Sequence, residues 1–151
     1  MIAVYSQHDV LIAVDLKAQN VGPDVVRLAN KYNVLHRLLF IGRTISEPEL
    51  RKQIKETSAK AHTAAVANNP DEFSNALAAA NADWVYFRFL PTTEQIEAVH
   101  RANKKSFIAG PTVAGNLPEN WQHCANVRLD AILTDYPLDI RGTLKQNKTQ
   151  Q

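Results

Sequence analysis

The stretch Val10-Leu11-Ile12-Ala13-Val14-Asp15-Leu16-Lys17 is an apolar run of strand length that ends in two charged residues. Its β-branched residues favour a strand over a helix. Alternation along a strand puts Ala13, Asp15 and Lys17 on one face and the larger apolar residues on the other. Functional side chains of parallel α/β sheets lie at the carboxyl ends of the strands, so Asp15 and Lys17 are candidate site residues. The same pattern also fits a strand end that only carries charge into solvent.

The composition indicates one globular domain. The 151 residues are 45% hydrophobic and 21% charged, with a net charge of +2. Scattered basic residues make no case for a nucleic-acid or membrane surface, and the single cysteine, Cys124, excludes an internal disulfide and a cysteine-based metal cluster. Neither a signal peptide nor an apolar run of membrane length is visible. The chain as written is expected to be cytoplasmic, although its localisation stays unknown.

Strands and helices are predicted to alternate along the chain. Six apolar runs have strand length, and they cover residues 10–17, 35–41, 62–67, 84–90, 106–109 and 131–134. Between and after them, apolar residues recur at helical spacing behind helix-start signals: Pro23, a capping box formed by Ser46 and Glu49, Asn69-Pro70-Asp71, Pro91-Thr92-Thr93, Pro118 and Pro137. Residues 1–5 are interpreted as the tail of a helix. A domain over residues 1–145 is followed by a polar tail, 146–151.

This alternation predicts a parallel sheet with right-handed crossovers. An open dinucleotide-binding sheet would need a glycine-rich loop after the first strand, and Asp15-Leu16-Lys17-Ala18 contains no glycine. Charged residues at strand ends, namely Asp15, Lys17, Arg88 and Asp135, favour a barrel instead. A complete (β/α)8 barrel has eight strands. The predicted fold class is therefore α/β, a partial TIM barrel of about six parallel strands whose first two strands are absent.

Two segments resemble the glycerophosphodiester phosphodiesterase family. Leu129-Asp130-Ala131-Ile132-Leu133-Thr134-Asp135-Tyr136-Pro137-Leu138 is similar to the last barrel strand of that family, which ends Asp-Gly-Ile-Ile-Thr-Asp-x-Pro. Val14-Asp15-Leu16-Lys17 resembles its third strand, Ile-Glu-Ile-Lys. The resemblance implies that the chain corresponds to strands three to eight of the family's barrel.

The resemblance also implies a reaction and a set of roles. The family hydrolyses glycerophosphodiesters to glycerol phosphate and an alcohol with the help of a divalent metal, Mg²⁺ or Ca²⁺. Asp15 would be a metal ligand, and Lys17 a catalytic residue in contact with the substrate phosphate. Arg88 would also bind the phosphate, and Asp135 would support the substrate site. Alternatively, Lys17 and Arg88 each form a salt bridge with a neighbouring carboxylate, which for Lys17 is Asp15 or Asp135.

Several motifs of the family are not found in this sequence. Its first strand ends His-Arg-Gly, its second carries Glu-x-Asp, and a His-Asp pair supplies a further catalytic histidine. His8-Asp9 imitates that pair but directly precedes the strand of Asp15, where the family has tens of residues between. The other histidines, His36, His62, His100 and His123, are not predicted at carboxyl ends of strands, so none is a convincing acid or base.

Three hypotheses follow. The chain is the C-terminal part of a phosphodiesterase and is weakly active or inactive alone, or it is a non-catalytic relative that binds a glycerophosphodiester or another phosphate ester through Lys17 and Arg88. In the third, the two open edges of a six-stranded sheet pair in a homodimer or with a missing N-terminal half.

Overall fold

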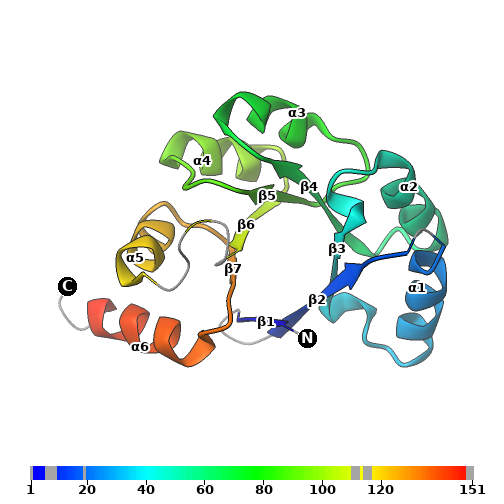
Figure 1. The fold of residues 1–151 in the computed structure, drawn as a ribbon, viewed down its shortest axis with the longest axis horizontal. Helices are drawn as coiled ribbons and strands as arrows, with labels where there is room; N and C mark the ends of the chain where they lie inside the picture. The colour runs from blue at the N-terminus through cyan, green and yellow to red at the C-terminus, as the bar shows by residue number, and fades with distance from the viewer. Residues whose placement is uncertain (1, 6–9, 19, 110–112, 114–116, 149–151) are drawn as a thin grey trace.

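The computed structural model describes residues 2–5, 10–18, 20–109, 113 and 117–148. In this part of the chain, seven strands form one closed barrel in the order β1 to β7 (Figure 1). They are β1 (Ile2–Tyr5), β2 (Val10–Leu16), β3 (Leu38–Gly42), β4 (His62–Ala67), β5 (Trp84–Phe87), β6 (Lys105–Ala109) and β7 (Ala131–Leu133). Strands β2 to β7 each pair in parallel with the next. The six parallel strands expected from the sequence are confirmed.

Helices follow the parallel strands and lie outside the sheet, as Figure 1 shows from α1 at the lower right through α3 at the top to α6 at the lower left. The α-helices are α1 (Gly22–Lys31), α2 (Pro48–Thr57), α3 (Phe73–Ala78), α4 (Thr93–Arg101), α5 (Pro118–Asn126) and α6 (Pro137–Lys148). Short 3₁₀ turns are η1 (Leu35–Arg37), η2 (Arg43–Ile45) and η3 (Pro70–Glu72). α6 continues through part of the predicted polar tail. No helix in the described ranges has the length and apolar character needed to cross a membrane.

The first strand corrects the interpretation of residues 1–5 as the tail of a helix. Residues Ile2–Tyr5 form β1, which pairs antiparallel with β2 over four positions, from Ile2 opposite Ala13 to Tyr5 opposite Val10. β1 also pairs antiparallel with β7, with Val4 opposite Leu133. A short run rich in β-branched and aromatic residues fits a strand as well as a helix end, and pairing on both sides favours the strand. Both edges that a six-stranded sheet would leave are thus paired by β1.

Side chains alternate between the barrel interior and the helix-covered outside. On β2, Leu11 and Ala13 pack in the interior, while Ile12, Val14 and Leu16 pack outside. On β5, Trp84 and Tyr86 point into the barrel interior. Val85 and Phe87 point the other way, into the outer core, which is the apolar core between the barrel and its helices. The alternation predicted for β2 is confirmed, and it places Asp15 on the strand face that points into the barrel.

Helix starts follow the sequence signals with one correction. Thr92 and Gln95 form a capping box at α4. The capping box predicted at Ser46 and Glu49 is wrong, because Glu47 is the N-cap residue of α2 and makes no side-chain cap bond. The proline after it, with a φ already suited to the first helical turn, sets the start of α2 instead. Leu50 and Ile54 of this helix are buried.

The second predicted strand also begins later than expected. Leu35–Arg37 forms the turn η1, and β3 covers Leu38–Gly42. Asn33 has a φ of 54°, a left-handed conformation that asparagine tolerates, and this reverses the chain after α1. The apolar run 35–41 therefore supplies one turn of 3₁₀ helix before the strand.

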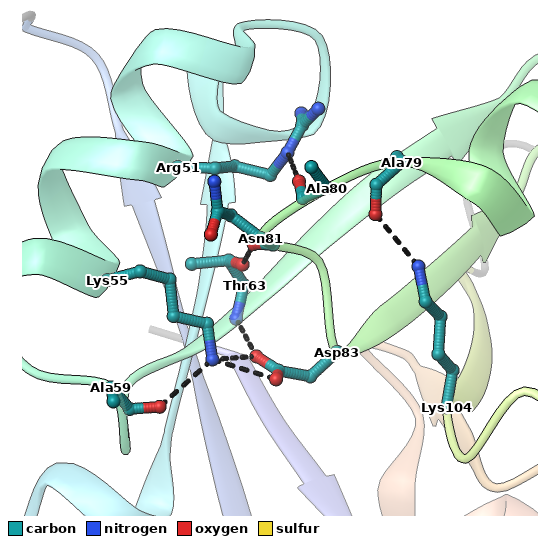
Figure 2. Close-up of polar contacts among 9 residues, drawn as sticks. All are labelled: Arg51, Lys55, Ala59, Thr63, Ala79, Ala80, Asn81, Asp83 and Lys104. Carbon is teal, nitrogen blue, oxygen red and sulfur yellow. Dashed lines mark hydrogen bonds and ion pairs between the residues drawn. The ribbon is translucent and has the colours of Figure 1, made fainter.

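Polar contacts join α2 to the amino ends of β4 and β5 (Figure 2). The Asp83 carboxylate accepts a hydrogen bond from the Thr63 backbone N–H at 3.1 Å and pairs with Lys55 Nζ at 2.7 Å. Lys55 Nζ also donates to the Ala59 carbonyl at 3.1 Å. This network lies at the end of the barrel opposite to the carboxyl ends of the strands, and it connects three elements that are distant in sequence.

We expect Asp83→Ala to lower the free energy of unfolding by about 2 kcal/mol, because the Thr63 N–H and the Lys55 ammonium lose their common acceptor. Urea unfolding followed by circular dichroism measures the change. Asp71→Ala is the control, since Asp71 is exposed on the η3 turn. Equal midpoints for the two variants would contradict a stabilising role for Asp83.

Candidate ligand-binding site at the mouth of the barrel

A cavity of about 600 Å³ opens where the parallel strands end. Side chains from six strands and the segments after them line it: Asp15, Leu16, Lys17, Ile41, Gly42, Arg43, Ile45, Ser46, Val66, Asn68, Tyr86, Arg88, Phe107, Ala109 and Leu133. The carboxyl ends of parallel strands are where barrel folds place their functional residues. The size suits a small organic ligand.

The lining divides into an apolar floor and a charged rim. Ile41, Val66, Phe107 and other apolar residues come from the strands themselves, and they belong to or pack against the interior core. Tyr86 stacks on Phe107 with ring centroids 4.7 Å apart and planes 8° apart. Asp15 is near the carboxyl end of β2, and Lys17, Arg43 and Arg88 follow the last positions of their strands, where the chain leaves the packed interior. The floor therefore offers apolar contact and the rim offers charge.

Asp15 and Lys17 lie together at the rim. Asp15 Oδ2 and Lys17 Nζ form an ion pair at 2.5 Å, and the side chains are 45% and 82% exposed. The structure thus shows Lys17 in one of its predicted arrangements, a salt bridge with Asp15. Gly42 of β3 pairs beside Leu16 and lies directly against the Asp15 carboxylate. The ion pair is exposed to solvent, so Lys17 can exchange Asp15 for another anion at low cost.

Arg88 follows β5 and points to the same cavity. Its Nη1 donates to Asn68 Oδ1 at 2.9 Å, and its guanidinium carbon lies 5.5 Å from the centre of the Tyr86 ring. Within the described ranges, the ion pairs formed at 4.0 Å or less do not include Arg88. The structure thus brings Asp15, Lys17 and Arg88 to one cavity, as expected from their strand ends.

Three further polar residues of the rim were not predicted from the sequence. Arg43 and Ser46 come from the segment after β3, and Asn68 follows β4. Arg43 Nε pairs with Glu47 Oε1 at 2.6 Å, and both side chains are about one-third exposed. The signal that singled out Asp15 would have found these residues too, because each follows the carboxyl end of a predicted strand within a few positions.

Asp135 lies elsewhere. It is exposed after β7 and is not among the described residues that line the cavity. The chain turns at this point, where the Tyr136 backbone N–H donates to Thr134 Oγ1 at 3.0 Å. Leu133 is the residue of this strand that reaches the cavity. A substrate role for Asp135 stays a prediction.

The described histidines are outside the cavity. His36 precedes β3 and His62 begins β4, so both lie at the opposite end of the barrel. Burial lowers the pKa of His62 from its ordinary value. His100 Nε2 contacts Asp130 at 3.0 Å, and His123 Nε2 contacts the Pro91 carbonyl at 2.8 Å.

Cys124 does not line the cavity either. His8-Asp9 lies outside the described residues. Cys124 is buried in the outer core, and burial raises the pKa of its thiol to about 12. A thiol with that pKa stays protonated near neutral pH and is a poor nucleophile.

The described residues of the rim do not fit a resident divalent cation. Asp15 is the one carboxylate among the described residues that line the cavity, and it is paired with Lys17. In the described ranges, no group of three or more histidine, cysteine, aspartate or glutamate side chains is placed to hold a metal ion. Mg²⁺ and Ca²⁺ require several oxygen ligands, and the rim instead presents two guanidinium groups. The chemistry of this rim favours an anion.

Solved structures share this fold. A glycerophosphodiester phosphodiesterase from Agrobacterium tumefaciens has a TM-score of 0.70 at 14% identity, over 89% of this chain and 56% of that one. Candidate glycerophosphodiester phosphodiesterases from Galdieria sulphuraria and Silicibacter pomeroyi have TM-scores of 0.68 and 0.65 at 16% and 14% identity. They are covered over 57% and 50% of their length, and cover 89% and 91% of this chain.

This chain therefore spans about half the length of the solved barrels that it resembles. No family model matches the sequence, and no curated protein matches it. Identities this low establish similarity of fold. The resemblance inferred from Val14–Lys17 and Leu129–Leu138 is confirmed at the level of the fold.

Proposed function

We propose that this chain is a glycerophosphodiester phosphodiesterase-like barrel that binds a phosphate ester at its mouth. Lys17, Arg43 and Arg88 contact the phosphate in this proposal. The observation that supports it is the convergence of these three cations on one cavity of about 600 Å³ whose floor is apolar. Arginine and lysine are the side chains that proteins use most for phosphate, because they donate charge-assisted hydrogen bonds.

The three cations differ in how much of their charge is already compensated. Lys17 is paired with Asp15 and Arg43 with Glu47, whereas Arg88 contacts the neutral Asn68 amide. Among the described residues Arg88 has no direct ion pair, although the Glu72 carboxylate is near enough to interact with it electrostatically. A phosphate that enters the rim would therefore not have to displace a carboxylate from Arg88, and it could replace Asp15 at Lys17. The apolar floor below would contact the organic part of the ester. A ligand with both a phosphate and a small organic group matches this arrangement better than a free divalent cation does.

Hydrolysis of a glycerophosphodiester is the finer part of the proposal. It needs a proton donor for the leaving alkoxide and a base for the attacking oxygen within hydrogen-bond reach. The described residues bring Lys17 and Asp15 to the cavity but no histidine. We therefore propose that the chain alone binds a phosphate ester and hydrolyses it weakly or not at all. Asp15 has no metal-binding role in this proposal, because the described residues of the rim do not fit the ion.

Calorimetric titration with glycerol 3-phosphate tests the proposal. We expect binding by the wild type in the presence of EDTA, and a loss of affinity of about tenfold for Lys17→Ala and for Arg88→Ala, since each removes one charge-assisted contact. Lys60→Ala is the matched control, because Lys60 is exposed before β4 at the opposite end of the barrel. No binding by the wild type, or equal affinity in all variants, would contradict the proposal.

A further inference from the structure

Arg88 is held in place by a neutral partner. Its Nη1 donates to Asn68 Oδ1 at 2.9 Å, and the guanidinium group lies over the Tyr86 ring. Two contacts of this kind restrict a long side chain that would otherwise sample many rotamers. A carboxylate in the position of the amide oxygen would restrict Arg88 as well, but it would also neutralise the charge that an anion needs.

The orientation of the Asn68 amide is in turn determined by Glu72. Asn68 Nδ2 donates to Glu72 Oε2 at 2.6 Å, and the Asn68 backbone N–H donates to the same oxygen at 3.0 Å. These hydrogen bonds, that of the backbone first, lower the pKa of Glu72 from its ordinary value, so its carboxylate is an acceptor at neutral pH. The amide nitrogen must therefore face Glu72. The amide oxygen is left for Arg88.

The turn η3 keeps Glu72 in this position. Asn69 Oδ1 accepts from the Glu72 backbone N–H at 3.1 Å, and Asn69 Nδ2 donates to Glu72 Oε1 at 3.2 Å. The segment after β4 is thus a small hydrogen-bonded unit that fixes the orientation of Asn68 Oδ1 towards Arg88. That oxygen contacts the one cation of the rim for which the described residues provide no ion pair.

We propose that Asn68 is a positioning residue, which holds Arg88 over the barrel mouth in the conformation that receives the phosphate of the ligand. This inference rests on the proposed function of the cavity. Asn68 increases affinity by removing the cost of ordering Arg88 at the moment of binding. Its neutrality leaves the guanidinium charge available to the ligand.

Glycerol 3-phosphate titrations of Asn68 variants test this role. We expect Asn68→Ala to bind roughly three- to tenfold more weakly than the wild type, which is the range for one side chain that must be ordered on binding. Asn68→Asp should bind more weakly still, because the new carboxylate pairs with Arg88. Asn75→Ala is the control, since Asn75 is exposed on α3 and does not line the cavity. Circular dichroism confirms the fold of each variant.

A double-mutant cycle separates positioning from a general structural effect. In the Arg88→Ala background, Asn68→Ala should cause no further loss, because Asn68 acts through Arg88. The proposed function stands if the wild type binds the ester and Arg88→Ala weakens that binding. In that case the positioning role of Asn68 is still wrong if the effects of Asn68→Ala and Arg88→Ala are additive. It is also wrong if Asn68→Asp binds as well as the wild type. If the wild type does not bind the ester, both are wrong.

Discussion

The Gly42→Ala protein is expected to be less stable than the wild type by on the order of 3 kcal/mol, from backbone strain and overpacking together. Gly42 ends β3 with a φ of 77° and a ψ of −128°, a conformation that residues with a Cβ rarely adopt. An added Cβ would lie 2.6 Å from the Leu16 carbonyl oxygen and 2.7 Å from the Leu16 nitrogen, and it would collide with Asp15 Oδ1. The backbone of β2 cannot move away without breaking its pairing.

Urea unfolding measures this change, and Gly142→Ala provides the comparison. Nothing lies within 4 Å of a Cβ added at Gly142, which is in α6. In a helix, alanine is favoured over glycine, so this control should be unchanged or stabilised by up to about 1 kcal/mol. If both variants unfold at the same urea concentration, the positive φ at Gly42 is not required by the fold.

Arg51→Met is expected to cost about 2 to 3 kcal/mol of stability. Arg51 is 4% exposed on α2 and donates to three carbonyls, those of Thr44 at 2.6 Å, Ile45 at 3.3 Å and Ala80 at 3.4 Å. Figure 2 shows the contact with Ala80. Burial of the guanidinium group lowers the pKa of Arg51, which shows that its charge is partly desolvated. Methionine carries no charge and removes this desolvation cost. It also leaves these carbonyls without their donor, and that penalty is the larger one where the acceptors are buried.

The neighbouring Lys52→Met is the control, since Lys52 is exposed on the same helix. Arg51 supports η2, from which Arg43 and Ile45 reach the cavity. We therefore also expect weaker binding of glycerol 3-phosphate by Arg51→Met at a temperature where the variant is folded. A midpoint of unfolding equal to that of Lys52→Met would show that the three carbonyls find other donors.

Local patterns were sufficient to predict most of the barrel. The six parallel strands follow from apolar runs of strand length, and β4 was predicted with the bounds that it has, His62–Ala67. The alternation along residues 10–17 predicted which side chains of β2 share a face, and the structure has Leu11 and Ala13 on one face and Ile12, Val14 and Leu16 on the other. β1 was missed because its identity depends on pairing with β2 and β7, and such long-range contacts leave no periodic signal in four residues.

The site was predictable to the extent that strand ends converge in a barrel. That rule predicted that Asp15, Lys17 and Arg88 lie at one end of the barrel, where they line the cavity, and their roles stay a prediction. The same rule applies to Arg43 and Asn68, which follow β3 and β4 within a few positions, but the sequence prediction did not include them. The pairing of Lys17 with Asp15 and the contact of Arg88 with Asn68 depend on side-chain conformations that spacing alone cannot determine.

The antiparallel direction of β1 affects how the protein should be handled. Ile2 is opposite Ala13 and Tyr5 is opposite Val10, so the amino end of β1 lies towards the carboxyl end of β2 and hence towards Asp15. An affinity tag fused ahead of β1 would begin at the rim of the cavity, where its charges could compete for Lys17 and Arg88. A tag fused after α6 avoids this rim, and ligand titrations should use protein purified in that way.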